Sequence, residues 1–405
     1  MTSDRDADLI VVGGGPAGVM TGLLFARAGC RVRILEKHKD FFRDFRGDTV
    51  HPSTMEILDQ LGMLQRFLQR PHNKVDRAEL QMAGRRWTIG DLSHLDTAAP
   101  FIAMMPQWEF LDFLRVEGRA FPGFQLDMEA PVASFIEENG SVVGVRLMDG
   151  SVLRAPLTVA ADGRASIARA LLPLEDLGAP MDVFWFRIAK PKSEKGALRG
   201  NVERGRLLVM IDRGDYWQCA FLIPKGAAEA YQKRGIDAIR EEVAKAAPED
   251  LDVAELDEIS DLHLLTVKLD RLTTWNRPGL LAIGDAAHAM SPIGGIGINL
   301  AVQDAVATAN ILAGPLARGE NVDSMLRRVQ ERRLFPTRII QAGQKAAQDR
   351  VIGRLLQGTE PIRKAPLIVR LFDRYPILQR IPGRVIGLGV RRERVRSPLA
   401  SAVLP

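Results

Sequence analysis

Residues Gly284 to Ala305 read GDAAHAMSPIGGIGINLAVQDA and connect a predicted strand to a predicted helix. The apolar run Leu280–Ile283 predicts the strand, and the helix is expected to begin near Ile298. Asp285 follows the strand directly, at the end where ligands bind in open α/β sheets. Glycines before a helix let a ligand approach the unpaired backbone N–H groups and the positive end of the helix dipole. The stretch therefore predicts a ligand site; a tight structural crossover is the alternative.

A second glycine motif lies near the start of the chain. Asp8–Val12 predicts a buried parallel strand, Gly13–Gly18 reads GGGPAG, and a helix is expected over Pro16–Ala28. The next predicted strand, Arg31–Leu35, is followed by Glu36, which stands 18 residues after the last glycine. A GxGxxG motif in this context predicts a dinucleotide whose pyrophosphate lies at the helix N-terminus. Glu36 would accept hydrogen bonds from a ribose, which favours FAD or NAD over NADP.

The composition is that of a globular chain of two or three domains, with 405 residues that are 46% hydrophobic and 26% charged. Two cysteines, Cys30 and Cys219, cannot form a disulfide framework, so a cytoplasmic location is expected. Cys30 opens an apolar strand and is expected to serve packing. No uninterrupted apolar stretch is long enough to span a membrane, and no metal site is expected.

Positive charge is concentrated near the C-terminus. Arg354–Arg396 contains 11 Lys and Arg against 3 Asp and Glu, whereas the whole chain has a net charge of only +5. This segment lacks a recognisable nucleic-acid-binding module, so nucleic acid is not expected as a partner. We expect amphipathic helices that pack on the body with their arginines facing outward, and contact with a membrane surface is a second possibility.

Residues between the two glycine motifs provide further candidates. Ala130–Leu147 alternates around the turn Asn139-Gly140, and with the strand Leu157–Ala160 it could form an antiparallel flap across the nucleotide. Asp162 follows that strand in an acid-glycine turn that leads into a predicted helix. Its side chain could contact a ligand or cap that helix. Gln107 stands at the start of another predicted helix.

From about Leu174 the pattern changes to an antiparallel sheet with one crossing helix, which predicts a separate substrate domain. Its expected strands are Met181–Ile188, Gly205–Asp212, Asp215–Ile223 and Leu262–Leu269, and its expected helix is Ala227–Ala246. Aromatic residues are 6% of the chain, yet several gather in these strands. Aromatic faces suit a planar apolar substrate, so Trp185, Tyr216 and Trp217 are the candidate contacts; core filling is the alternative.

Three motifs together make the sequence resemble the FAD-dependent aromatic hydroxylases of the para-hydroxybenzoate hydroxylase fold, the group A flavoprotein monooxygenases. They are GGGPAG from Gly13, ADGRASIAR from Ala161, and WNRPGLLAIGDAAHAMSPIGGIGIN from Trp275. They occur in the family's order and extend over nearly the whole chain. The resemblance implies an α/β fold with a Rossmann-like FAD-binding domain, an inserted antiparallel-sheet substrate domain and a C-terminal helical segment. The expected ranges are 1–174 and 271–345 for the two parts of the FAD-binding domain, 175–270 for the substrate domain and 346–405 for the helical segment.

The resemblance also implies which residues bind FAD. The ADP half would lie against the first glycine motif and Glu36, the ribityl-phosphate part against Asp285, and the isoalloxazine ring along the segment from Pro292 to Asn299. The full expected set is Gly13, Gly15, Pro16, Ala17, Gly18, Glu36, Lys37, Arg46, Gln107, Val132, Asp162, Gly284, Asp285, Pro292, Gly295, Gly297, Ile298 and Asn299.

The chemistry implied by the resemblance is an aromatic hydroxylation. NADH or NADPH, held in a groove, reduces the flavin; oxygen adds at the C4a carbon, and the hydroperoxide transfers one oxygen atom to an aromatic or polycyclic substrate. No residue stands out as a catalytic base, and we interpret His288 as structural. The segment Val159–Ala161 lacks the Cys-His pair that some members carry there.

Other functions remain open at this point. An FAD-dependent reductase of an apolar, isoprenoid-like substrate is the main alternative, since its substrate would also suit an aromatic pocket. A flavin-dependent halogenase is not favoured, because Trp217–Pro224 lacks the paired tryptophans of that class. A prenyl-protein-binding protein would not need the GDAAH segment. The sequence predicts no particular substrate or oligomeric state.

Overall fold

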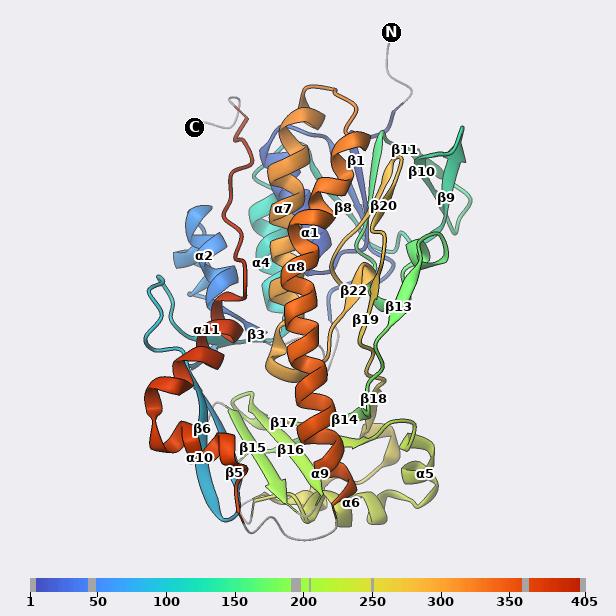
Figure 1. Ribbon diagram of the computed structural model, residues 1–405. Helices are drawn as coiled ribbons and strands as arrows, with labels where there is room; N and C mark the ends of the chain where they lie inside the picture. The colour runs from blue at the N-terminus through green and yellow to red at the C-terminus, as the bar shows by residue number, and fades with distance from the viewer. Residues whose placement is uncertain are drawn as a thin grey trace.

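The computed structural model describes residues 5–42, 49–190, 198–203, 205–248, 251–358 and 364–400. Figure 1 shows a sheet with its covering helices in the upper half of the molecule and a second sheet in the lower half. The long helix α8 (Asp323–Ala347) runs from one half toward the other (Figure 1).

The upper sheet has six strands in the order β20-β21-β12-β1-β2-β8. Five are parallel: β1 (Leu9–Val12), β2 (Val32–Leu35), β8 (Phe124–Asp127), β12 (Leu157–Ala160) and β21 (Leu280–Ala282). The edge strand β20 (Asn276–Arg277) is antiparallel. All four residues of β1 are buried, because both faces of a parallel sheet are covered. The predicted Rossmann-like α/β fold is confirmed.

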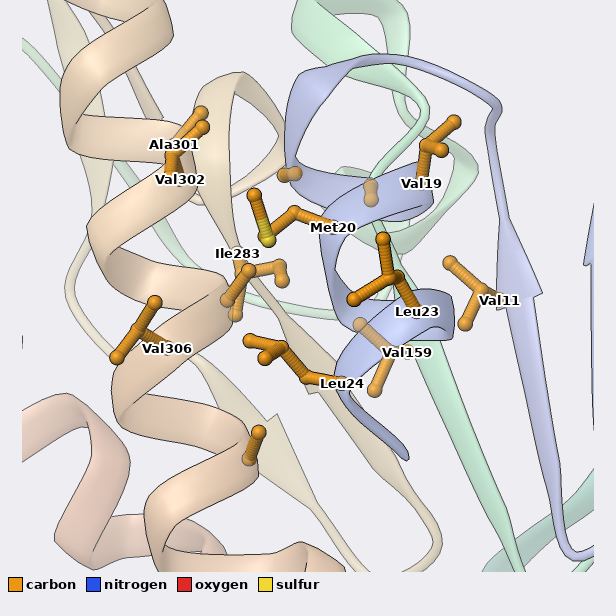
Figure 2. Packing of buried hydrophobic residues seen from close by; sticks show 14 of the residues in the cluster. Val11, Val19, Met20, Leu23, Leu24, Val159, Ile283, Ala301, Val302 and Val306 are labelled. Atoms are coloured by element: carbon orange, nitrogen blue, oxygen red, sulfur yellow. The ribbon is translucent and has the colours of Figure 1, made fainter. Parts of the chain in front are cut away.

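Two helices cover the sheet beside the glycine motifs. α1 (Pro16–Arg27) packs against α7 (Gly297–Ala317), and Figure 2 shows Met20 and Leu24 of α1 directed toward Ile283 and α7. In the described residues, α7 with the turn before it is long and apolar enough to cross a membrane. Because 83% of its most apolar window is buried in the protein, it serves as the core helix.

Short elements complete this half of the molecule. The helices are α2 (Pro52–Gln60), α3 (Leu64–Phe67) and α4 (Gln107–Gly118). One small sheet joins β3 (Thr49–Val50), β7 (Ile102–Met104) and β4 (Asn73–Val75), and another joins β13 (Leu174–Asp176), β19 (Asp270–Leu272) and β22 (His288–Ala289).

The predicted flap is formed by β9 (Val132–Glu138), β10 (Ser141–Leu147) and β11 (Val152–Arg154). Asn139 and Gly140 turn the chain with φ values of 50° and 80°, as expected for a tight hairpin. The assignment of Leu157–Ala160 to this flap is wrong, because that strand is β12 of the parallel sheet. Its residues are all buried, which fits a strand covered on both faces.

The lower sheet has seven strands in the order β18-β14-β17-β16-β15-β5-β6. They are β18 (His263–Leu265), β14 (Met181–Ala189), β17 (Tyr216–Pro224), β16 (Arg206–Asp212), β15 (Leu198–Glu203), β5 (Arg77–Met82) and β6 (Arg85–Asp91). The hairpin β5–β6 precedes the predicted insertion at 175–270, so this sheet is not built from the insertion alone. β5 joins through a parallel pairing of Met82 with Val202.

Two predicted elements of this region are shorter than expected. The helix predicted over Ala227–Ala246 is split into α5 (Ala228–Lys233) and α6 (Ile236–Ala244) by Gly235, whose φ of +84° does not fit a helix. The strand predicted over Leu262–Leu269 is only β18. It ends early because the Val267 amide donates to the Asp182 carboxylate at 2.9 Å instead of joining a sheet.

The C-terminal part of the chain begins with α8, which is not interrupted at Pro336 and ends at Ala347. A π-helical turn (Gln348–Ile352) and α9 (Gly353–Gln357) follow, and then α10 (Leu367–Arg374), a 3-10 turn (Pro376–Gln379) and α11 (Arg380–Leu388). The expectation that these helices bury their apolar faces is wrong for α10, since Leu367 is 69% exposed.

After α11 the chain returns along the upper half, as Figure 1 shows. A buried polar network holds it there. The Arg333 guanidinium contacts Asp304 at 2.8 Å and Glu393 at 3.3 Å, and Asp304 contacts His288 at 2.6 Å. Burial by itself would raise the pKa of Asp304, but His288 and Arg333 hold it below its ordinary value. Breaking such a pair would leave a buried charge without its partner, which is strongly destabilising. This network therefore fixes the C-terminal tail to α7 and α8.

His51 links α2 to α11 and makes stability depend on pH. Its Nδ1 lies 2.8 Å from the Ile386 carbonyl oxygen, and burial lowers the pKa of His51 from 6.5 to about 4. Between these pH values the unfolded chain binds a proton that the folded chain does not. We predict a loss of up to about 3 kcal/mol in unfolding free energy as the pH falls through this range. In His51→Asn, whose amide can replace the Nδ1–H donor but cannot titrate, denaturant titrations at several pH values should show a smaller loss. An equal loss in both proteins would exclude His51 as the cause.

Candidate functional site

The three motif turns meet at the carboxyl ends of neighbouring strands. A Cβ atom at Gly13 would lie 2.5 Å from the Ala161 carbonyl oxygen, and one at Gly284 would lie 3.0 Å from the Ala17 Cβ. Gly13 and Gly284 also have φ values of +104° and +57°, which favour glycine. The structure thus brings together turns separated by more than a hundred residues, at the edge of the sheet where ligands bind.

The N-terminus of α1 is less crowded than the turn before it. The nearest atom to a Cβ at Gly15 would be 4.0 Å away, in contrast to the tight surroundings of Gly13. Pro16 is the first helical residue, and no described side chain caps the helix. The first turn also lacks an acidic residue. Its backbone N–H groups and the helix dipole therefore suit a phosphate.

Glu36 lies beside this turn, at the end of β2. Its Oε2 accepts a hydrogen bond from the Gly14 amide at 2.8 Å, and its Oε1 accepts one from the His38 amide at 3.1 Å. These bonds fix the carboxylate next to the glycine turn. Carboxylate oxygens accept more than one hydrogen bond each, so ribose hydroxyls can be added. Lys37, the next predicted contact, is exposed.

Asp162 occupies the turn against Gly13. Burial raises the pKa of its carboxyl, and its Oδ2 accepts a hydrogen bond from the Ile167 amide at 3.1 Å. Its buried Oδ1 has no hydrogen-bond partner within the described ranges, which suits a ligand hydroxyl. The helix predicted after Asp162 is wrong: the chain forms only two 3-10 turns, Gly163–Ala165 and Ile167–Ala170.

Asp285 is held at the same edge by two arginines. Arg164 Nε lies 3.1 Å from its Oδ2, and Arg169 donates to its carbonyl oxygen at 2.7 Å. Arg169 also makes a bidentate pair with Asp270 at 2.8 and 2.9 Å. Arg169 ends the ADGRASIAR motif but was not among the predicted contacts. It fixes the backbone of the Gly284–Asp285 turn, while the Asp285 side chain stays partly exposed.

The loop before α7 leads into a second helix N-terminus that no described side chain caps. A Cβ at Gly297, its first residue, would meet no atom within 4 Å. Ile298 and Asn299 are buried. The Asn299 Oδ1 accepts hydrogen bonds from the His51 amide at 2.9 Å and from the Thr54 hydroxyl at 2.7 Å. Its side-chain oxygen therefore ties α7 to α2, while its Nδ2 donates to the Gly295 carbonyl oxygen at 3.4 Å.

Two glutamines of α8 and one of the π-helical turn that continues it hold the loop from the other side, and sequence reasoning missed them. The Gln344 amide donates to the carbonyl oxygens of Ser291 and Ile293, both at 3.0 Å, and Gln348 donates to the Ser291 hydroxyl at 2.8 Å. Gln341 donates to the Ala289 carbonyl oxygen at 3.2 Å. The spacing of positions 341, 344 and 348, which places them on one helix face, was the available signal.

The other expected cofactor contacts lie near this edge or outside the described ranges. Gln107 is the first residue of α4 and is half-buried. Val132 begins the flap and packs with Val12 and Leu35. Pro292 and Gly295 lie in the loop before α7, where the Thr49 hydroxyl donates to the Gly295 carbonyl oxygen at 2.8 Å. Arg46 falls outside the described residues.

The lower sheet presents two different faces. Trp185 and Tyr216 lie on one face, because Trp185 is opposite Ala220 and Tyr216 is opposite Ala189 in the paired strands. Successive residues of a strand alternate between faces, so Trp217 points to the other face, away from its neighbour Tyr216. There it is fully buried in the core between this sheet and α6. The expectation that Trp217 contacts the substrate is therefore wrong.

The face that carries Trp185 and Tyr216 is turned toward the glycine turns. Trp185 packs in a cluster with Ile293, which lies in the loop before α7. The buried Nε1 of Trp185 has no hydrogen-bond partner among the residues that the structure describes. This face therefore keeps Trp185 and Tyr216 as candidate substrate contacts, with a buried donor that a ligand oxygen could use.

His288 and Cys30 have the structural roles expected of them, and Cys219 is likewise buried. His288 is buried and contacts Asp304, on the side of α7 that faces α8. Cys30 and Cys219 are both buried, and burial raises the pKa of the Cys30 thiol to about 12. Neither thiol is therefore suited to act as a nucleophile.

Comparisons with known proteins agree with this geometry. The family described as "FAD binding domain" matches residues 6–342. The 6-methylpretetramide 4-monooxygenase of Streptomyces rimosus is 33% identical over 406 residues, covering 97% of this chain and 94% of that protein. The para-nitrophenol 4-monooxygenase of a Pseudomonas species is 24% identical, covering 78% of this chain and 80% of the relative. A rifampicin monooxygenase of Streptomyces venezuelae is 29% identical, and the chain spans only 62% of its length.

Solved structures show the same fold. PqsL of Pseudomonas aeruginosa, in complex with 2-aminobenzoylacetate, superposes with a TM-score of 0.74 at 21% identity, covering 91% of this chain and 99% of that one. The anhydrotetracycline hydroxylase OxyS of Streptomyces rimosus gives a TM-score of 0.73 at 21% identity, covering 96% and 77%. The chain belongs to the FAD-dependent aromatic monooxygenases of the group A flavoprotein monooxygenase family.

Proposed function

We propose that this monooxygenase uses NADH or NADPH and molecular oxygen to hydroxylate a polycyclic aromatic compound. The observation that carries the proposal is the sheet face of Trp185, which shares an apolar cluster with Ile293, a residue of the loop before α7. An apolar aromatic surface at this place suits a planar substrate lying beside the flavin. The identity to the 6-methylpretetramide 4-monooxygenase over nearly the whole length of both chains supports the same class of substrate.

The residues present fit FAD along the line of the three turns. The N-terminus of α1 at Gly15 would take the pyrophosphate, and Glu36 the ribose. Asp285 and the unpaired Oδ1 of Asp162 would accept hydrogen bonds from the ribityl part, and the N-terminus of α7 at Gly297 would face the ring. When bound, the flavin supplies the reduction of oxygen and the transfer of one oxygen atom.

The protein's own contribution is to orient the ring, stabilise charge and exclude water. Amides at the start of α7 would stabilise negative charge on a reduced ring by about 0.3–2 kcal/mol. Gln344 and Arg169 fix the backbone of the loop that leads into this helix, so the amides need not reorganise during the reaction. No catalytic base is assigned. The oxygen-transfer route expected from the resemblance stays a prediction, as does the choice between NADH and NADPH.

One further expectation stands as a proposal. A cytoplasmic location is consistent with two buried, unpaired cysteines. The FAD-dependent reductase that was the main alternative gains no support from the relatives named above, which are monooxygenases or a hydroxylase.

The reaction can be tested with isotopic oxygen. With 6-methylpretetramide as the probe and NADH or NADPH as reductant, mass spectrometry should find one labelled atom in the product when the oxygen gas is labelled. Labelled water should leave the product unlabelled. Label only in hydrogen peroxide or water, across a panel of aromatic probes, would contradict the hydroxylase proposal.

Substitutions at two glycines of the first turn distinguish an effect on folding from an effect on FAD binding. In Gly13→Ala the new Cβ meets the Ala161 carbonyl oxygen, so we predict a lower melting temperature even without FAD. In Gly15→Ala the new methyl lies 4.0 Å from its nearest neighbour, an ordinary contact, so the apoprotein should melt as wild type does while FAD binding weakens by about tenfold or more. Calorimetry measures the melting temperature of each apoprotein, and FAD titration measures its affinity for FAD. Tight FAD binding by Gly15→Ala would contradict the placement of the pyrophosphate.

Trp185→Phe tests the substrate face. The buried Nε1 of Trp185 lacks a described partner, so its removal breaks no hydrogen bond, and the melting temperature of the free enzyme should fall only by the packing that the smaller ring loses. Loss of a hydrogen bond to a substrate oxygen should raise KM for 6-methylpretetramide by about tenfold. The control is Trp87→Phe, whose Nε1 donates to the Met82 carbonyl oxygen at 3.0 Å. That variant should melt lower with KM unchanged. An unchanged KM in Trp185→Phe would remove Trp185 from the substrate site.

A further inference from the structure

The two helices after α9 expose an unusual number of apolar side chains. Of the nineteen large apolar side chains that are exposed in the described residues, seven lie between positions 367 and 385. We name them the C-terminal apolar surface: Leu367, Ile368, Leu371, Tyr375, Ile377, Ile381 and Val385. Exposure reaches 69% for Leu367, 67% for Ile377 and 63% for Ile381. Figure 1 shows α10 and α11 at an outer corner of the molecule, beside β6.

α10 packs on the body through the side of the helix that carries Val369. Val369 is the buried residue of the helix and lies in a cluster with Trp87 of β6. Leu367 and Leu371 are spaced by four residues, so they lie on one side of the helix, and Tyr375 follows at its C-terminal end. All three are exposed, and Val369 lies on a different side. The fold therefore uses only a small part of the apolar surface of this amphipathic helix.

α11 is attached through glycines, and two of its apolar side chains face outward. A Cβ at Gly383 would overlap the Asp91 carbonyl oxygen, and one at Gly387 would lie 2.7 Å from a Leu95 methyl group. The helix backbone thus lies directly on the end of β6. Ile381 and Val385 stay exposed. Close backbone packing holds this surface in a fixed position on the body.

Positive charge surrounds the C-terminal apolar surface. Arg370, Arg374, Arg380 and Arg384 are exposed, and within the described ranges none of them forms an ion pair. The one acidic residue in the range 364–388 is Asp373, which pairs with Arg85 at 2.9 Å. The surface therefore combines exposed aliphatic side chains with uncompensated cations.

The combination of exposed aliphatic side chains and unpaired arginines favours one class of partner over the others. A second copy of the chain, meeting this surface by two-fold symmetry, would place arginines against arginines. Single-stranded nucleic acid is bound by stacking on aromatic rings, whereas this surface is aliphatic apart from Tyr375. A bilayer with anionic headgroups accepts both the apolar stripe and the cations. We propose that the protein docks its C-terminal apolar surface on anionic lipid membranes, with α10 lying in the plane of the interface.

The test uses the full-length, FAD-loaded protein and two kinds of vesicle, phosphatidylcholine alone and phosphatidylcholine mixed with phosphatidylglycerol. We expect co-sedimentation with the mixed vesicles at low salt, at least about tenfold above that with phosphatidylcholine, and a decrease as salt rises. The variant Leu367→Ser/Ile377→Ser/Ile381→Ser and the variant Arg370→Gln/Arg374→Gln/Arg384→Gln should each lower binding by about tenfold or more.

The control variant is Met148→Ser/Arg119→Gln, which changes an exposed apolar residue and an exposed arginine elsewhere on the protein. It should bind vesicles as wild type does. Circular dichroism and flavin content should stay unchanged in all three variants, because the altered residues are exposed. Equal binding by wild type and the two surface variants would overturn the proposal. A second result would also overturn it: wild type sediments as a dimer in sedimentation velocity and the triple serine variant as a monomer. That result would identify a second copy of the chain as the partner of this surface.

Discussion

The contact of the glycine turns with one another is the constraint on which the rest of the structure depends. Gly13 lies against Ala161, and Gly284 lies against Ala17, at distances that leave no room for a side chain. Because β1, β12 and β21 are neighbours in the sheet, their carboxyl ends bring the three turns to one edge. Two helix N-termini, those of α1 and α7, then open onto the same edge. This arrangement accounts for a single extended site from motifs that are far apart in the chain.

Buried polar side chains from the second half of the chain hold these turns in place, together with Arg169. Arg169 fixes the carbonyl group of Asp285, and Gln344 fixes those of Ser291 and Ile293. The network of Asp304 with Arg333 then secures α7 to α8. Removing one partner from such a buried network leaves a polar group or a charge unpaired, which costs about 1–5 kcal/mol. The helices around the site are therefore fixed by polar contacts as well as by apolar packing.

The sequence predicted what depends on local spacing. The glycine turns, the strands before them and Glu36 follow from short patterns whose physical meaning does not require knowledge of the fold. Features set by long-range pairing were not accessible in the same way. The place of Leu157–Ala160 between β1 and β21, and the addition of the hairpin β5–β6 to the lower sheet, depend on partners more than a hundred residues away. The direction of Trp217 depends on which face of that sheet meets the flavin-binding half.

The most direct test of the central claim, that three turns form one site, is hydrogen exchange of the apoprotein with and without FAD. We predict that amides in residues 13–18, 161–164 and 284–298 all become protected on addition of FAD. Protection of the three ranges should rise together over the same range of FAD concentrations, with one FAD bound per chain. Protection confined to the first turn, with the other two unchanged, would contradict it.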